Sequence, residues 1–566
     1  MEGMRVLTLL LAGAAFSGVQ MMSAQSTSFD SLVDRYFDDY FRLNPTAATA
    51  LGFHHPYDGQ LEDYSKRGFA KRIDLSRKYL PLFEKMSQSD ERDLMLARLQ
   101  ADILNIENIR QQTTNPDVYS SGVTQSIFGL ISRKFASPEE RLRDVISREQ
   151  QIPQVLLDAR ISLDNPPKIY TEVALQQLPG SESFFANDVP AAFPDIKNGK
   201  LLAEFKKVNA TVVDALKGYE QWLKSDLLAK SNGDFRIGAE NFHKKLLYEE
   251  MVDIPLDRLL AIGYANLHAN QNALKEVSKK IDSTKTPQAI SERLGQDHPP
   301  PDQLLQAFRN TFNGLIDFID AHHIITIPSQ TRPILEETPP FMRALTTASM
   351  DTPGPYEKVA TEAYFNVTLP EKDWPAERTE EFMTAFSRGT IVSTAIHEAY
   401  PGHFVQLLYF KQVPSKVRKL VWANTNVEGW AHYTEQMMLD EGYGNGKLEL
   451  RAGQLMDALL RNCRYIVGIE MHTGKMTFEQ GVEFFMREGF LSRAYAEVET
   501  KRGTSDPTYL YYTLGKLEIL KLREDYRKKM GSAFTLEQFH NEFMRQGGVP
   551  IKLIRHSMLG DNSPTL

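Results

Sequence analysis

The stretch HEAYPGH, residues 397–403, decides how the rest of the chain is interpreted. Its two histidines, His397 and His403, stand on either side of a carboxylate, Glu398. With Glu428 from the downstream stretch VEGWAHYTE, they make a set of two histidines and one glutamate that can bind zinc and leave a fourth position for water. Glu398, next to the first ligand, is then placed to take a proton from that water. The sequence therefore predicts a metallohydrolase, and among hydrolases a peptidase.

The spacing of the two histidines departs from the common zinc motif HExxH, in which they lie four residues apart on one helix face. His403 follows His397 by six positions, an offset of about 240° around a regular helix and about 9 Å along its axis. Pro401 lacks the N–H that would bond the preceding turn, and Gly402 permits backbone angles that other residues avoid. We therefore expect the helix to be distorted at Pro401 and Gly402, which returns His403 to the face of His397.

The composition excludes several other classes of protein. The chain has 566 residues, of which 42% are hydrophobic and 24% charged, as is ordinary for a soluble globular protein. The net charge of -8 and the lack of a dense basic cluster argue against nucleic acid as a partner. Cys463 is the only cysteine, which excludes an intramolecular disulfide framework and a multi-cysteine metal site. The chain has no Gly-x-Ser-x-Gly elbow, so a serine hydrolase is not expected.

Residues 1–24 have the features of a secretory signal peptide. Arg5 gives a positive start, residues 6–16 form an apolar core, and Ser23 and Ala24 offer small side chains for cleavage. The apolar core is shorter than the roughly 20 residues that a bilayer span needs. We expect an exported protein, periplasmic or secreted, with no stable membrane insertion after the signal is removed. The alternative is a cytosolic protein with an apolar start.

Helical patterns dominate the chain, because apolar residues recur at spacings of three and four along most of its length. The fold class is therefore expected to be mainly α, with a small β-sheet next to the metal-binding helix. We expect a single metallopeptidase-like domain at residues 25–566, in which a helical body (25–325) precedes a catalytic half (326–566). The helices expected from the pattern cover residues 66–86, 91–107, 138–163, 196–228, 255–281, 380–406, 414–439, 448–472, 477–488, 508–530 and 536–545.

Two short β-branched or aromatic runs, residues 324–328 and 363–367, are the strand candidates. A loop is expected between them, at residues 350–355. An edge strand has free N–H and C=O groups with which an extended peptide can pair. Tyr364 and Asn366 are therefore candidate substrate-binding residues. The alternative, a strand that only covers the core, fits the sequence equally well.

The stretches HEAYPGH and VEGWAHYTEQ together resemble the bacterial "domain of unknown function 885" family, whose motifs are HExxPGH and EGWAxYxE. The resemblance covers nearly the whole mature chain, including residues 44–58, 364–367 and 512–515. These proteins in turn resemble the thimet-oligopeptidase-like gluzincins, which are mainly helical zinc peptidases with a deep channel. The resemblance implies one Zn²⁺ per chain and short, unfolded peptides as substrates.

The resemblance also implies site residues, with His397, His403 and Glu428 as metal ligands and Glu398 as the base. In the thimet-type enzymes a second glutamate follows the ligand glutamate by seven residues, as Glu435 does here. Seven residues are two helical turns, so both glutamates project from one face, and Glu435 is placed to accept a hydrogen bond from a ligand histidine. His432 is a further candidate, as a hydrogen-bond donor beside the ligands or a rival ligand, although a packed helix histidine is the commoner case.

The thimet-type enzymes use a late tyrosine to stabilise the oxyanion. Tyr512 best matches the family's Tyr-x-x-Gly. Tyr509 stays an alternative, because this chain has Ser-Asp-Pro-Thr at residues 505–508 where the family often has Pro-Gly-Gln-Ala. Either tyrosine is equally well explained by packing on a helix face. Arg461 and Arg464 are candidates for bidentate pairing with a substrate carboxylate, and structural ion pairs are their alternative.

Two other functions are compatible with the same residues. One is a metal-dependent amidase or esterase that acts on a non-peptide substrate, since the same activated water attacks any suitable carbonyl. The other is an exported protein that binds peptides or metal without hydrolysis. The presence of Glu398 argues against this second alternative, because binding alone does not need a base.

Overall fold

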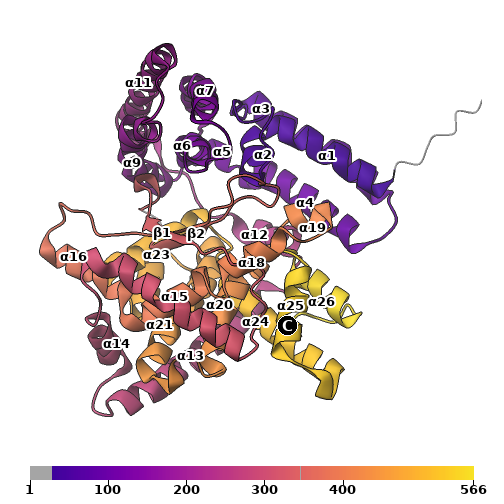
Figure 1. Ribbon diagram of the computed structural model, residues 1–566, viewed down its shortest axis with the longest axis vertical. Coiled ribbons are helices and arrows are strands. Elements are labelled where there is room, and N and C mark those ends of the chain that lie inside the picture. The colour runs from indigo at the N-terminus through magenta and orange to yellow at the C-terminus, as the bar shows by residue number, and fades with distance from the viewer. Residues whose placement is uncertain (1–27, 344–345) are drawn as a thin grey trace, which may run out of the picture.

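The computed structural model describes residues 28–343 and 346–566. The expected signal peptide, residues 1–24, lies outside the described residues. The described chain is mainly helical with a three-stranded sheet near its centre (Figure 1), so the predicted fold class is confirmed. Within the part of the chain that the structure describes, no helix combines the length and the apolar character that a bilayer crossing requires.

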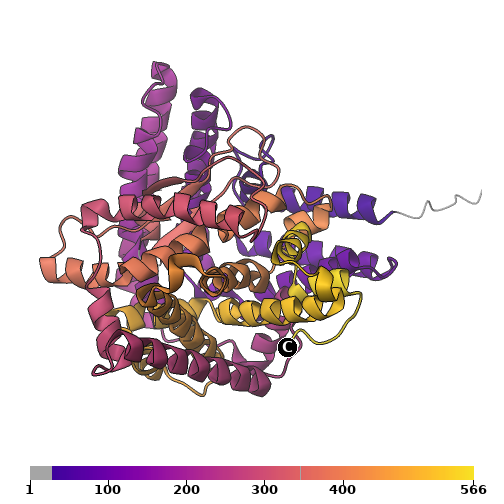
Figure 2. The same cartoon turned by 60° about the horizontal axis from the view of Figure 1, so that its bottom comes forward.

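One group of helices from the first half of the chain packs around a core of its own, which includes Tyr119, Ile127 and Leu216. In Figures 1 and 2 this group, in purple, projects away from the other helices. The helix expected at residues 138–163 is in fact two helices, because Pro153 cannot continue a helix from the preceding turn. The group consists of α6 (Asp117–Ile131), α7 (Pro138–Glu149), α8 (Ile152–Ser162), α9 (Lys168–Ser183) and α11 (Gly199–Trp222).

Two further cores combine segments from both sides of residue 325, where the helical body was expected to meet the catalytic half. The larger core contains the sheet and these helices: α1 (Phe29–Leu43), α3 (Lys66–Glu84), α4 (Asp90–Leu104), α15 (Leu304–Ala321), α17 (Arg388–Glu398), α18 (His403–Phe410), α20 (Asn424–Asp440), α24 (Tyr511–Met530), α25 (Leu536–Arg545) and α26 (Ile551–Leu559). The other core contains α12 (Gly238–Glu249), α13 (Leu256–Ile281), α21 (Leu448–His472) and α22 (Phe478–Gly489), with α23 (Arg493–Ser505) against it.

The sheet has the strand order β1-β3-β2. Its strands are β1 (Ile334–Glu337), β2 (Ala348–Asp351) and β3 (Tyr364–Val367). The central strand, β3, runs parallel to β1 and antiparallel to β2. Strand β2 is therefore at an edge of the sheet, and it lies beside α17.

Two expectations for this region are wrong. Residues 324–328 form no strand, because side chains from distant helices bond the backbone groups that a ladder would use: His540 donates to the carbonyl of Ile324, and Tyr409 donates to that of Thr326. Met350 and Asp351, expected in a loop, belong to β2. Tyr364 and Asn366 lie in the central strand, so they are not at an edge; the edge strands are β1 and β2.

Two pairs of glycines bring the helices of the later half into close contact. Gly389 of α17 meets Gly453 of α21, and Gly429 of α20 meets Gly515 of α24. A Cβ on any of these four glycines would overlap the backbone of the opposite helix. Helices α17 and α20 are thus packed closely against α21, which carries Arg461 and Arg464, and α24, which carries Tyr512.

Candidate metal centre

The helix that carries His397 is interrupted where the sequence predicts. Helix α17 ends at Glu398, and α18 begins at His403 after a non-helical connection of residues 399–402. A Cβ on Gly402 would overlap the carbonyl oxygen of His397, so this connection requires glycine. The indole of Trp430, on α20, donates a hydrogen bond of 2.8 Å to the carbonyl of Pro401. The predicted distortion is confirmed, and Trp430 is a residue holding it that the sequence did not single out.

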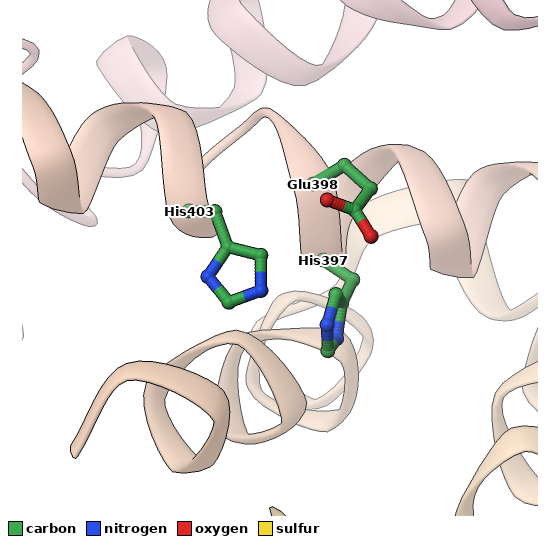
Figure 3. A group of neighbouring side chains, drawn as sticks. All are labelled: His397, Glu398 and His403. Atoms are coloured by element: carbon green, nitrogen blue, oxygen red, sulfur yellow. The ribbon is translucent and has the colours of Figure 1, made fainter. Parts of the chain in front are cut away.

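This interruption brings the two histidines together. The ring centroids of His397 and His403 lie 4.8 Å apart, with the rings nearly perpendicular. One potential ligand atom from each of His397, Glu398 and His403 lies within 4.8 Å of the others, and Figure 3 shows the three side chains facing one space from the two sides of the break. Glu428, on α20, completes the group, because its Oε2 lies 3.3 Å from the Nε2 atoms of both histidines.

Hydrogen-bonding partners leave lone pairs facing this space. Nδ1 of His397 lies 2.7 Å from Oε1 of Glu435. Since a carboxylate only accepts, Nδ1 carries the hydrogen, and Nε2 of the neutral ring has a lone pair. Oε2 of Glu428 and Oε2 of Glu398 are buried and have no hydrogen-bond partner among the described residues. The site therefore brings together the Nε2 lone pair of His397 and the Oε2 atoms of Glu428 and Glu398, which share no hydrogen bond.

Protonation of His397 at both ring nitrogens is the alternative to a bound metal ion. Burial opposes protonation, but the nearby Glu428 carboxylate and the hydrogen bond with Glu435 raise the pKa of His397 to about 9. The 3.3 Å contact to Glu428 nevertheless lacks the geometry of a hydrogen bond, and Oε2 of that carboxylate stays unpaired. A divalent cation fits the arrangement better, because it satisfies both imidazoles and the carboxylate at once.

The separations suit a tetrahedral ion. Zinc bonds to nitrogen and oxygen of about 2.0–2.1 Å imply ligand atoms about 3.3–3.4 Å apart in a tetrahedron. Oε2 of Glu428 lies 3.3 Å from each histidine Nε2. His397, His403 and Glu428 are thus able to hold Zn²⁺ and leave a fourth position, with the Glu398 carboxylate next to it.

Glu435 is the centre of a buried network behind His397. Its carboxylate accepts hydrogen bonds from His397 and from Nδ1 of His432 at 3.1 Å, and it forms an ion pair with Arg461 at 3.0 Å. Burial favours the neutral acid, but Arg461 and the two histidines outweigh it and hold the pKa of Glu435 well below its usual value. Burial, with a smaller contribution from Lys516, lowers the pKa of His432 to about 3. Glu435 is thus ionised and orients His397, while His432 is a neutral donor to Glu435.

The two arginines proposed for a substrate carboxylate are engaged within the protein. Arg464 makes a bidentate pair with buried Glu499, at 2.6 and 2.9 Å. Arg461 bonds Glu435 and the carbonyl of Asp457. Arg461 and Arg464 thus form ion pairs within the protein, which was the alternative to binding a substrate carboxylate.

The two late tyrosines are in different surroundings. The ring of Tyr512 lies 6.3 Å from that of His397. Tyr509 is fully buried, its ring lies against Gly468 and Gly503, and its hydroxyl has no partner among the described residues. Of the two, Tyr512 is the one beside the cluster.

A further arginine contacts Tyr512. Arg502, on α23, donates a hydrogen bond of 2.9 Å to the Tyr512 hydroxyl. Burial raises the pKa of Tyr512, and Arg502 opposes this effect. Arg502 was not among the residues predicted from the sequence, because this arginine belongs to a separate helix and to no motif.

The sheet residues proposed for substrate binding make their contacts elsewhere. The guanidinium of Arg133 lies 5.8 Å from the centre of the Tyr364 ring. Asn366 is 1% exposed, and its amide lies 3.5 Å from the hydroxyl of Ser349 on β2. Among the described residues, neither makes a hydrogen bond, ion pair or ring contact with the metal-binding set.

Comparisons with solved structures find the same fold in proteins of two other organisms. A candidate lipoprotein of unknown function from Shewanella oneidensis is 28% identical, with a TM-score of 0.77 over 94% of this chain and 100% of that one. A candidate lipoprotein from Colwellia psychrerythraea is 16% identical, with a TM-score of 0.80 over 94% of this chain and 98% of the other. No curated protein matches the sequence.

A family model extends this likeness to the sequence motifs. It matches residues 45–558, which include the histidines of α17 and α18 and both glutamates of α20. The family is described as bacterial proteins of unknown function. The chain therefore belongs to the DUF885 family.

Proposed function

We propose that this chain is a zinc-dependent peptidase that hydrolyses short peptides. The observation that carries the proposal is the position of the Glu428 carboxylate oxygen, 3.3 Å from the Nε2 atoms of both His397 and His403 without a hydrogen bond. Such a set of acceptors in a buried place is typical of a metal site and is unfavourable without a cation. The choice of zinc follows from two imidazole ligands and one carboxylate.

The chain's own residues supply the acid–base chemistry. When bound, zinc would lower the pKa of a water molecule and polarise the scissile carbonyl. Glu398 accepts the proton of the attacking water and passes it to the leaving amine; its buried Oε2 has no other partner among the described residues. Tyr512 accepts a hydrogen bond from Arg502, so its own hydrogen is free to bind the oxyanion. One such donor contributes roughly 3–4 kcal/mol to the stability of the transition state.

A peptide substrate suits the surroundings of the cluster. Strand β2 is at the edge of the sheet and beside α17, whose last two residues are His397 and Glu398. Its free N–H and C=O groups can pair with an extended chain. The role that the sequence analysis gave to Tyr364 and Asn366 thus passes to the backbone of β2.

Export and the relation to thimet-type enzymes form part of the same proposal. The two structural neighbours are described as candidate lipoproteins, which supports export to the periplasm or beyond. The thimet-oligopeptidase-like gluzincins remain the source of the expectation that the substrates are short, unfolded peptides. That expectation rests on the motifs HExxPGH and EGWA alone.

The test is peptide hydrolysis by the zinc-loaded protein, read by mass spectrometry of a peptide library, with Glu398→Gln beside it. We expect wild type to cleave peptides and Glu398→Gln to lose at least about 10²- to 10⁴-fold in kcat while it keeps its metal. Glu449→Gln, an exposed glutamate on α21, is the matched control and keeps full activity. Near wild-type turnover in Glu398→Gln contradicts the assigned base. Cleavage of amide or ester probes but of no peptide favours the amidase or esterase, and uncleaved but bound peptides favour a binding protein.

A further inference from the structure

A cavity of about 600 Å³ lies between α6, which belongs to the projecting group of helices, and α18, which begins at His403. Its walls come from α6, from α18, from the end of β2 with the loop that follows, and from α2 (Pro45–Leu51). Gly122, Ser126 and Gly129 of α6 all line it, and their spacing of four and three places them on one helix face. Small side chains on this face leave the hollow open. None of the proposed metal ligands lines the cavity.

Four charged groups at the cavity wall form two ion pairs, whereas Arg148 has no acidic partner at ion-pair distance among the described residues. Arg133 pairs with Asp351 at 2.6 Å, and His54 pairs with Glu357 at 2.7 Å. Arg148 is buried and donates to neutral oxygen atoms. A charged ligand would therefore find no free counter-charge at these pairs.

The remaining wall combines polar residues, among them Thr46, Gln125 and Ser132, with a part that is apolar and rich in aromatic rings. Trp422 is 40% exposed, an unusual exposure for a side chain of this size in this protein. The cavity volume falls in the roughly 300–1,000 Å³ range of small-molecule sites. This apolar part of the wall suits a neutral, apolar ligand group. The apolar part of the wall consists of Phe128, Phe135, Met350, Leu407, Phe410 and Trp422.

The cavity adjoins both elements of the proposed substrate site. Met350 and Asp351, at the end of the edge strand β2, belong to its wall. Leu407 of α18 also lines it, four residues after His403 and thus about 6 Å along the same helix face. An extended chain that pairs with β2 would bring its next side chains, at about 3.3 Å per residue, to the cavity.

We propose that this cavity binds a large apolar or aromatic side chain of a peptide that lies along the free edge of β2, and thereby sets the side-chain preference of the enzyme. The inference rests on the proposed peptidase function for its effect on catalysis. Binding of the apolar side chain can be measured without catalysis.

Gly129 offers a way to fill the cavity without disturbing the fold. A Cβ at Gly129 meets no other atom within 4 Å, whereas one at Gly122 would meet the hydroxyl of Tyr64. Gly129→Val and Gly129→Leu therefore fill the hollow in two steps and improve the helix propensity of the position. Gly199→Leu, at the start of α11, is the matched control, because a Cβ there also meets nothing within 4 Å.

The probes are peptides of one sequence in which a single position, moved along the chain, is Phe or Ala. At one position we expect wild type and Gly199→Leu to prefer Phe over Ala by roughly ten- to hundredfold in kcat/KM. Gly129→Val should reduce this preference and Gly129→Leu abolish it, because the Phe peptide loses more of its kcat/KM than the Ala peptide does. The same peptides are titrated calorimetrically into the Glu398→Gln forms of these proteins, where the preference should appear in Kd.

The outcomes separate the two proposals. Peptide cleavage with the same Phe preference in wild type and Gly129→Leu overturns the role of the cavity and leaves the peptidase standing. No cleavage of any peptide by wild type overturns the peptidase. In that case, Phe-dependent binding that is lost in Gly129→Leu still supports the cavity as a binding site, and equal binding by both proteins overturns it.

Discussion

Two histidines of this protein are each held between carboxylates, and the two arrangements differ in what they leave unsatisfied. His54, next to the cavity, lies between Asp58 at 3.1 Å and Glu357 at 2.7 Å, and each contact is a hydrogen bond to a separate ring nitrogen. Both nitrogens therefore donate, and the ring is a cation that ties the segment after α2 to the loop after β2. His54 also stacks on Phe135, with the ring centroids 3.9 Å apart.

His397 shares only one half of this arrangement. Its Nδ1 is bonded to Glu435 at 2.7 Å, as in the other group, but its Nε2 faces Glu428 at 3.3 Å without a hydrogen bond. A second imidazole, that of His403, makes the same contact with the same oxygen. His54 satisfies both of its carboxylates by taking up a second proton. In the other group two histidines share one carboxylate oxygen, and a metal ion could bind all three atoms. Three predictions test this difference.

The largest effect is expected from the aromatic neighbour of each histidine. His397 has Tyr512 beside it, with a hydroxyl, where His54 has Phe135. Tyr512→Phe should lower kcat by about 10²–10³-fold with little change in KM, because it removes a donor to the oxyanion only. Tyr509→Phe is the matched control and should keep wild-type kcat. A drop of equal size in both variants, measured in steady-state peptide hydrolysis, would show that packing and not the hydroxyl matters.

A smaller effect is expected from the carboxylates that orient the two rings. Glu435→Gln places an amide where three donors converge, so His397 loses its fixed orientation, and zinc affinity should fall about 10- to 100-fold. Asp58→Asn makes the equivalent change beside His54 and should leave zinc affinity unaltered. Competition with a chromogenic chelator measures both constants. Equal zinc affinity in wild type and Glu435→Gln would contradict the role given to Glu435.

The smallest expected effect is a pH dependence of the free energy of unfolding that comes from the hydrogen bonds of His54 with Asp58 and Glu357. Burial lowers the pKa of His54, but hydrogen bonds with Asp58 and Glu357 outweigh it and raise the pKa above the ordinary 6.5. These hydrogen bonds therefore contribute fully below pH 6.5 and are lost as the pH rises through the raised value. Urea unfolding should show His54→Gln less stable than wild type by about 1–3 kcal/mol at low pH, with the gap closing at high pH. A gap that is constant or widens with pH would contradict the assignment.

Local chemistry made the central part of the site predictable. Pro401 and Gly402 indicate the break that returns His403 to His397, because both act on the backbone of their own turn. The seven-residue spacing of Glu428 and Glu435 predicts that they share a helix face. In the structure these two carboxylates reach the two nitrogens of the same His397 ring.

Long-range contacts account for what the sequence did not indicate. Ile324 has the β-branched character of a strand, but His540, 216 residues away, occupies its carbonyl. Arg464 has the form of a substrate clamp, yet Glu499 from another helix already accepts a bidentate pair of hydrogen bonds from its Nε and one Nη. Arg502 reaches Tyr512 only because α23 and α24 fold together. In each case the partner lies on another element, and no local pattern shows it.

The central claim is that His397, His403 and Glu428 hold a metal ion, and metal content tests it most directly. Wild type, the double variant His397→Ala/His403→Ala and the control His54→Ala are purified, offered zinc and analysed by elemental mass spectrometry. We predict about one zinc per chain in wild type and in His54→Ala, and none in the double variant. Absence of zinc from wild type, or equal zinc in the double variant, would contradict the claim.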